Sequence, residues 1–276
     1  MLPTFLVIGA SKAGTTSLYN YLRGHPQIFM SEKKEPQFFP LEFNWKLGLE
    51  WYERHFEGAG EALAVGEAST TYTRYPHSKG IPERIATVLP GVRLIYVVRH
   101  PVERMRSQFQ QHRAFGWEPE PSIDRALLAN PFYLNISRYA MQVEQYLEHV
   151  NRDQILIITS EALLHERDAT MRSVFEHVGV APDLAVPSSG REYNATRRAP
   201  NLTLARAAAL PGVRTLTRVV PTGTKRSVAR LLSRRIDPAD AMMSNEVRRE
   251  LEDRLREDVG RLGRYLNAGF DGWGIA

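Results

Sequence analysis

The stretch that decides the fold is PTFLVIGASKAGTTSLYNYLR at residues 3–23. Its apolar part, Phe5–Gly9, predicts a buried strand, and Thr15–Arg23 predicts a helix that begins soon afterwards. The heptapeptide SKAGTTS at 11–17 therefore predicts a turn that leads from the strand into the helix. The first N–H groups of a helix lack intrahelical partners, and the helix dipole favours an anion beside them. This segment indicates a phosphate-binding turn.

The position of the lysine separates this turn from a nucleoside-triphosphate clamp. In a Walker A loop, G-x-x-x-x-G-K-[ST], the lysine follows the second glycine. Gly9 and Gly14 have that spacing, but Thr15 stands at the lysine position and the lysine is Lys12, inside the loop. Glycine allows the backbone to approach a phosphate closely, and the hydroxyls of Thr15 and Thr16 add donors. The pattern favours a site with one cation at a single phosphate.

A second anion site is predicted where the apolar run Arg93–Val98 leads into RHPVERMRSQF at 99–109. The run predicts another buried parallel strand, and Pro101 suits the first turn of a helix, where its missing N–H costs nothing. Arg99 is expected at the strand end and Ser107 about two turns into the helix. The planar guanidinium and the hydroxyl suit a phosphate monoester, so the two side chains predict a second anion contact.

Together, these two motifs resemble the cofactor signature of the sulfotransferases that use 3′-phosphoadenosine-5′-phosphosulfate (PAPS). A third match is KEPQFF at 34–39, which is similar to the K-E-x-x-F-F segment of carbohydrate and heparan-type sulfotransferases. Weaker matches follow in GEAS at 66–69, in the predicted helix at 137–147 and in FDGW at 270–273. Three ordered motifs at compatible spacings make the resemblance specific.

The resemblance implies transfer of a sulfuryl group from PAPS to an acceptor hydroxyl, with release of adenosine 3′,5′-bisphosphate. The acceptor can be a sugar, a lipid or a small metabolite, and the K-E-x-x-F-F match favours a carbohydrate. The resemblance assigns the first motif to the 5′-phosphosulfate and the second to the 3′-phosphate. The residues that it places on the nucleotide are Lys12, Ala13, Gly14, Thr15, Thr16, Ser17, Arg99 and Ser107. Glu35 takes the place of the family's catalytic base.

The pattern along the chain and the resemblance both predict an α/β fold. It is a P-loop-like three-layer sandwich, with a central parallel sheet flanked by helices and a helical C-terminal segment. The predicted strands are Phe5–Gly9, Ala64–Glu67, Arg93–Val98 and Gln154–Thr159. The predicted helices are Thr15–Arg23, Leu47–Phe56, Ile81–Leu89, Val102–Phe115, Ser137–Val150 and Ala169–Val178. We expect a single domain over 1–276, with a core at about 1–180 and a basic, mostly helical part at about 193–276.

The chemistry needs an in-line attack and neutralisation of charge on the leaving phosphate. Lys12 is expected at the bridging oxygen between sulfur and the 5′-phosphate, where its charge stabilises bond cleavage. Glu35 is expected to take the proton of the acceptor hydroxyl, with a pKa raised by partial burial beside Phe38 and Phe39. A nearby ammonium of the preceding lysine would oppose that shift. Glu67, at another strand end, remains an alternative base. A sulfuryl group carries less charge than a γ-phosphoryl group, so no metal is required.

Basic residues are concentrated in one part of the chain. The net charge is only +5, yet residues 193–236 contain ten Lys or Arg and neither Asp nor Glu. Three interpretations remain open: a lid over the 3′-phosphate, a cradle for an anionic acceptor, or a solvated surface. Arg197 is the residue we expect to close over the nucleotide. Val228, Leu231, Leu232 and Ile236 give the segment 225–236 an apolar face among arginines, so peripheral membrane contact is a minor alternative.

Composition limits the remaining classes. The chain has 276 residues, no cysteine and no run of 18 apolar residues, so neither disulfides nor a transmembrane helix are predicted. Residues 1–10 lack a basic region and a cleavage site, which argues against a signal peptide and favours a cytoplasmic enzyme. The histidines are scattered and no metal site is predicted. A P-loop-type kinase or NTPase is the alternative enzyme, and an anion or nucleic-acid binder acting through 193–236 is the non-enzymatic alternative. Nucleic acid is not the expected partner, and the oligomeric state is not predicted.

Overall fold

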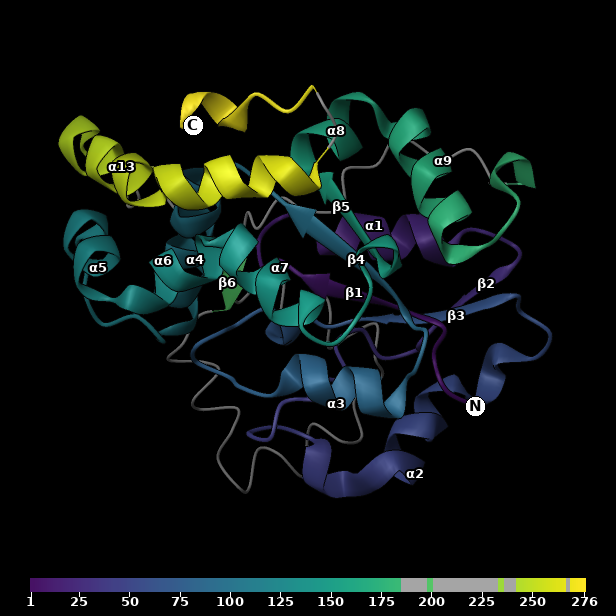
Figure 1. The fold of residues 1–276 in the computed structure, drawn as a ribbon. Coiled ribbons are helices and arrows are strands. Elements are labelled where there is room, and N and C mark those ends of the chain that lie inside the picture. Colours follow the sequence, from purple (N-terminus) through teal and green to yellow (C-terminus); the bar gives the residue numbers. More distant parts are fainter. Residues whose placement is uncertain (185–197, 201–232, 236–241, 267–268) are drawn as a thin grey trace, which may run out of the picture.

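A five-stranded, all-parallel sheet forms the centre of the molecule (Figure 1). The computed structural model describes residues 1–184, 198–200, 233–235, 242–266 and 269–276. The strand order is β2-β3-β1-β4-β5. The strands are β1 Phe5–Gly9, β2 Ile28–Met30, β3 Ala64–Ala68, β4 Arg93–Val98 and β5 Ile155–Thr159. Because all five run the same way, their carboxyl ends, and the loops that follow them, meet at one edge of the sheet.

Helices cover both faces of this sheet, which confirms the predicted three-layer α/β arrangement. Helices α1 and α9 lie on one face, and α3 and α7 lie on the other (Figure 1). The helices up to β5 are α1 Thr15–Arg23, α2 Gly48–Glu53, α3 Ile81–Val88, α4 Pro101–Phe115, α5 Ile123–Ala129, α6 Pro131–Ser137 and α7 Tyr139–Leu147. Those after it are α8 Ser160–His165, α9 Arg167–Val178 and α13 Asn245–Leu262.

The first strand is buried along its whole length and brings the predicted turn to the sheet edge. Phe5, Leu6, Val7 and Ile8 are at most 1% exposed, because β3 and β4 pair with β1 on its two sides. Gly9 ends the strand at φ 156°, and a Cβ there would lie 2.1 Å from Thr73 Oγ1. Only glycine fits this close approach, which sets the direction of the turn that follows.

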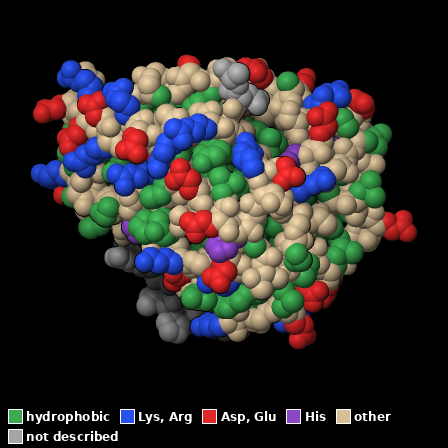
Figure 2. Space-filling view, in the orientation of Figure 1, with side chains coloured by type: hydrophobic (Ala, Val, Ile, Leu, Met, Phe, Trp, Pro, Cys, Tyr) green, Lys and Arg blue, Asp and Glu red, His purple; other side chains and the backbone are tan. Residues whose placement is uncertain are grey.

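The C-terminal helix α13 packs on the far end of the molecule and confirms the predicted helical C-terminal segment. Its apolar residues Leu251, Leu255 and Val259 are fully buried in a second apolar cluster formed with α4, α5 and α6. Asp258 accepts hydrogen bonds from the backbone N–H groups of Ala140 and Met141 at the start of α7, 3.0 Å each. Figure 2 shows basic and acidic side chains interspersed over α13, in agreement with its intrahelical ion pairs.

Most of the predicted strands and helices agree with the structure to within two residues at each end. Helix α1 and strands β1 and β4 have the predicted bounds. The predicted helix at 47–56 is shorter, because only Gly48–Glu53 is α-helical and 3₁₀ turns flank it. The predicted helix at 137–150 spans Tyr139–Leu147. Strand β2 was not predicted. No helix among the described residues has the length and hydropathy that crossing a bilayer requires.

Candidate active site

A cleft of about 470 Å³ lies at the carboxyl edge of the sheet. Each of the five strands is followed by residues that line it, as expected for a ligand site in an open parallel sheet. The lining residues are Ser11, Lys12, Gly14, Thr15, Thr16, Ser17, Tyr21, Lys34, Glu35, Thr70, Arg99, Ser107, Gln111, Ser160, Glu161, Leu163 and Leu164. The structure therefore brings both predicted anion motifs and the K-E-x-x-F-F segment to one cleft.

The turn after β1 presents the start of α1 to this cleft. Gly14 precedes the helix at φ 98°, a left-handed conformation that favours glycine. No described side chain caps α1 and no acidic residue lies in its first turn. Thr16 and Ser17 are partly exposed to the cleft, whereas Ala13 is fully buried and its side chain does not line it. The uncapped helix start is suited to an anion.

Lys12 lies among other cations on this side of the cleft. Burial, and after it the positive charges of Arg99, Arg104 and Lys34, together lower its pKa from 10.5 to about 8. Arg99 Nη1 also donates to the Lys12 carbonyl at 3.4 Å, which links the end of β4 to the first turn. A bound anion would relieve this repulsion and favour the charged ammonium.

Arg99 and Ser107 occupy the positions predicted for them. Arg99 follows β4, Ser107 lies on α4, and both line the cleft together with Lys12. The Tyr139 hydroxyl donates to the Arg99 carbonyl at 2.8 Å and holds the backbone at this strand end. Arg197 lies outside the described residues, and so does the segment 201–232.

Arg104 is a buried cation whose role the motif analysis did not assign. Its guanidinium is fully buried beneath the first turn and donates to Ser137 Oγ at 2.7 Å and to the Tyr133 carbonyl at 2.8 Å. It also donates to Gln108 Oε1 and, at 3.5 Å, to the Ser11 carbonyl. These four acceptors are neutral, so Arg104 adds positive charge beneath the cleft. In the sequence, a role for Arg104 was indicated by its position in the same motif as Arg99.

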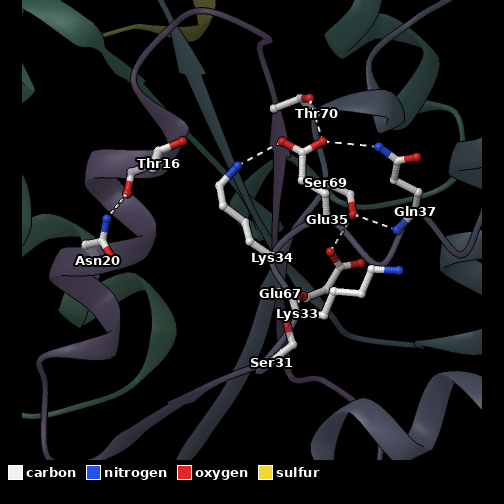
Figure 3. A network of polar contacts seen from close by, with 10 residues as sticks. All are labelled: Thr16, Asn20, Ser31, Lys33, Lys34, Glu35, Gln37, Glu67, Ser69 and Thr70. Atoms are coloured by element: carbon white, nitrogen blue, oxygen red, sulfur yellow. Dashed lines mark hydrogen bonds and ion pairs between the residues drawn. The ribbon is translucent and has the colours of Figure 1, made fainter. Parts of the chain in front are cut away.

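Glu35 lies across the cleft, on the loop after β2 (Figure 3). Its Oε1 pairs with Lys34 Nζ at 2.8 Å, and its Oε2 accepts from Gln37 Nε2 and Thr70 Oγ1 at 3.2 Å each. Burial by itself would raise the pKa of Glu35, but the Lys34 charge and the three hydrogen bonds lower it overall. The expected rise in pKa is therefore wrong: the lysine head does lie close, and its charge and the hydrogen bonds together outweigh partial burial.

Glu67, the alternative base, is fully buried at the end of β3 and is not among the residues that line the cleft. Its carboxylate accepts from Tyr52 Oη at 3.1 Å, Tyr72 Oη at 2.5 Å and Ser69 Oγ at 2.7 Å. Burial raises its pKa to about 7 against the opposing effect of these hydrogen bonds. Of the two carboxylates, Glu35 is the one that a ligand in the cleft can reach.

The sequence did not lead us to predict that residues after β5 line the cleft. Ser160, Glu161 and Leu163 of α8 line the cleft, together with Tyr21 of α1. Glu161 Oε1 accepts from the backbone N–H of His100 at 3.1 Å, which ties the start of α8 to the residue after Arg99. For the three residues of α8, the sequence offered only their position after a predicted strand as an indication. Among the described residues, no three His, Asp or Glu side chains lie close enough together to hold a metal ion.

Comparison with known proteins agrees with these motifs. The family model described as the sulfotransferase domain matches residues 2–189. The mouse bifunctional heparan sulfate N-deacetylase/N-sulfotransferase 4 is 30% identical over 200 residues, which cover 66% of this chain and 23% of that protein. The membrane-associated sulfotransferase kil1 of Dictyostelium discoideum is 40% identical over 119 residues, or 42% of this chain and 24% of that protein. The chain therefore spans less than a quarter of the length of these two relatives.

Solved structures show the same fold. The sulfotransferase from Alicyclobacillus acidocaldarius has a TM-score of 0.70 and 24% identity, and the match covers 99% of both chains. A sulfotransferase domain from the curacin biosynthetic pathway has a TM-score of 0.52 and 19% identity, over 69% of this chain and 79% of that one. Because the family model matches more than half of the residues, this chain belongs to the sulfotransferase domain family.

Proposed function

We propose that this enzyme transfers the sulfuryl group of PAPS to a hydroxyl of a carbohydrate acceptor and releases adenosine 3′,5′-bisphosphate. The observation that carries the proposal is the composition of the cleft. An uncapped helix start, Lys12 and Arg99 lie on one side, and Glu35 lies on the other. This arrangement suits a nucleotide with two separate anionic ends and a hydroxyl brought up against a base.

The donor set fits such a nucleotide. The start of α1, with Lys12, Thr16 and Ser17, would hold the 5′-phosphosulfate, and Arg99 with Ser107 would hold the 3′-phosphate. The depressed pKa of Lys12 supports this fit, because it reflects burial and, after it, neighbouring cations, and a bound anion would stabilise the charged ammonium against both. The bound donor would supply an activated sulfuryl group and a phosphate as the leaving group.

Glu35 and Lys12 would have separate roles in the reaction. Glu35 would accept the proton of the acceptor hydroxyl as the new oxygen–sulfur bond forms. Lys12 would stabilise the negative charge that develops on the bridging oxygen as the old sulfur–oxygen bond breaks. Because Glu35 is already ionised and hydrogen-bonded by Gln37 and Thr70, it would be aimed at the acceptor before the acceptor binds.

A carbohydrate acceptor is supported by the K-E-x-x-F-F segment and by the relatives whose names specify heparan sulfate. The matching relatives include N- and O-sulfotransferases, so an acceptor panel should contain amino sugars beside hydroxylated ones. A cytoplasmic location is part of the same proposal, and fractionation of the native cell tests it.

The experiment is transfer of labelled sulfate from PAPS to an acceptor panel, read by the mass of the sulfated product. Transfer that persists in excess EDTA supports the proposal, because the kinase alternative needs Mg²⁺ and a nucleoside triphosphate. Parallel reactions with MgATP test that alternative. Calorimetry with adenosine 3′,5′-bisphosphate provides a readout without turnover, and absence of binding would contradict the proposal.

A further inference from the structure

The loop that carries Glu35 has a strained backbone. Glu35 and Gln37 adopt positive φ values of 62° and 53°, in the left-handed region that side chains other than glycine rarely occupy. Such a conformation persists only where the surrounding structure holds it. The question is which contacts hold this loop, since the direction of the Glu35 carboxylate depends on it.

Three backbone N–H groups of the loop are bound by residues at and after the end of β3. The N–H of Glu35 donates to the Ala68 carbonyl at 3.0 Å. The N–H of Gln37 donates to Ser69 Oγ at 3.0 Å, and the N–H of Phe38 donates to Tyr72 Oη at 3.1 Å. Two of the three acceptors are therefore hydroxyl groups, which are able to rotate and to donate instead.

Glu67 determines which way these two hydroxyls point. A hydroxyl that accepts from a backbone N–H must direct its own hydrogen elsewhere, and both hydrogens go to Glu67. Ser69 Oγ donates to Oε2 and Tyr72 Oη donates to Oε1 (Figure 3 shows the Glu67–Ser69–Gln37 part). Above its pKa of about 7, Glu67 is ionised and only accepts, so it leaves the oxygen lone pairs of both hydroxyls facing the loop.

We propose that Glu67 is the positioning residue for Glu35: through Ser69 and Tyr72 it holds the loop at residues 35–38 in the conformation that aims the Glu35 carboxylate into the cleft. Reading Glu35 as the base rests on the proposed function, whereas the anchoring of the loop does not. Gln37 completes the connection, because its N–H binds Ser69 and its side-chain amide donates to Glu35.

Tyr52 offers a matched control within the same network. Its hydroxyl also donates to Glu67, at 3.1 Å, and its ring stacks on Phe38 with centroids 4.4 Å apart. No described backbone N–H of the loop donates to the Tyr52 hydroxyl. The variants Tyr52→Phe and Tyr72→Phe each remove one fully buried hydroxyl from Glu67 and keep the ring. Only the second removes a bond to the loop.

The first measurement is hydrogen exchange of the Gln37 and Phe38 amides in the full chain. We expect exchange of at least one of the two amides to rise about tenfold in Glu67→Gln, since the amide donor that replaces one carboxylate oxygen turns the hydroxyl bound there away from the loop. Ser69→Ala should act on Gln37 and Tyr72→Phe on Phe38. Tyr52→Phe should leave both unchanged. Equal protection in wild type and Glu67→Gln would overturn the inference, and so would equal effects of the two tyrosine variants.

The second measurement separates positioning from stability alone. In Glu67→Gln and Tyr72→Phe, kcat for sulfate transfer should fall about 10–100-fold while the affinity for adenosine 3′,5′-bisphosphate stays the same. If wild type transfers sulfate and these variants keep its kcat, the inference fails and the proposed function stands. If wild type transfers none, the proposed function fails, and hydrogen exchange alone decides whether Glu67 anchors the loop. Should Glu67→Gln not fold, Ser69→Ala and Tyr72→Phe against Tyr52→Phe give the same decision.

Discussion

The two walls of the cleft handle charge in opposite ways. On the wall formed after β1 and β4, Lys12 is a partly buried cation and Arg104 a fully buried one, and the described acceptors of Arg104 are neutral. On the wall formed after β2 and β3, the Glu35 carboxylate is paired with Lys34 and hydrogen-bonded. The first wall lowers the pKa of its lysine toward neutrality, and the second keeps its carboxylate ionised.

This difference indicates how each wall works. The cationic wall is unfavourable without an anion and gains stability when one binds, so its contribution should appear in ligand affinity and in charge stabilisation. The carboxylate wall is already satisfied by the protein, so its contribution should appear in turnover with little effect on nucleotide affinity. Variants on each wall therefore test one side of this contrast.

The largest effect is expected from Glu35→Gln, which removes the proton acceptor and keeps the shape of the side chain. Turnover with PAPS should fall about 10²–10⁴-fold, as is usual when a general base is lost. The affinity for adenosine 3′,5′-bisphosphate, measured by calorimetry, should stay within about twofold of wild type. Glu32→Gln, at an exposed residue three positions earlier, is the control. Lost affinity with preserved turnover would assign Glu35 to the nucleotide instead.

Lys12→Ala should lower turnover by about 10²–10³-fold, because a preorganised positive charge at the leaving group is removed. Unlike Glu35→Gln, it should also weaken binding of the nucleotide. Steady-state rates and calorimetry on the same preparation measure both effects, with Lys46→Ala at an exposed lysine as the control. Near-normal turnover in Lys12→Ala would contradict the role of Lys12 at the leaving group.

Arg99→Ala tests whether the cationic wall binds the two anionic ends of the nucleotide with different residues. A charged hydrogen bond contributes about 1.5–3 kcal/mol, so affinity for the 3′-phosphorylated nucleotide should fall about 10–100-fold. Affinity for the nucleotide without the 3′-phosphate should change little. Arg106→Ala is the control, because Arg106 lies on α4 beside Ser107, pairs with Glu103 and does not line the cleft. Equal weakening of both nucleotides would mean that Arg99 does not contact the 3′-phosphate.

The depressed pKa of Lys12 predicts a pH dependence of nucleotide affinity. With a pKa of about 8 in the free enzyme, Lys12 is charged below that pH and loses its proton above it. A bound anion favours the charged form, so affinity should be constant below about pH 7.5 and fall by up to tenfold per pH unit above pH 8. Calorimetry from pH 7 to 9.5 measures this, and Lys12→Arg should flatten the curve. A flat wild-type curve would place the anion away from Lys12.

The motifs of the cationic wall were predictable from the sequence. The turn after β1 and the Arg99–Ser107 motif depend on local features: a buried strand, a glycine or proline at the helix start, and polar residues at short fixed distances. The structure brings these motifs to one cleft because parallel strands share a carboxyl edge.

Long-range contacts were not predictable in this way. The direction of the Glu35 pKa depends on Thr70, 35 residues away in the chain, as well as on where the Lys34 side chain turns. Two of the four acceptors of Arg104 come from residues 133 and 137 on another helix. Strand β2 has three residues, too few for a periodic pattern to indicate it.

Lys34→Ala should give the smallest effect and tests whether the lysine sets the charge of the carboxylate wall. Without the ammonium, burial remains as the main influence and raises the pKa of Glu35. Since the base acts in its ionised form, the acid limb of the kcat profile should move to higher pH. The pair is about one quarter exposed on each side, so solvent screens it and the shift should be less than about one pH unit.

The control for this shift is Lys33→Ala, the neighbouring lysine, whose ammonium lies 5.9 Å from the Trp51 ring centroid instead of on Glu35. Its acid limb should coincide with that of wild type. If both variants move the limb equally, the effect comes from the overall charge of the loop and not from the Lys34–Glu35 pair. If Lys34→Ala leaves the limb in place, hydrogen bonds from Gln37 and Thr70 are sufficient to keep Glu35 ionised.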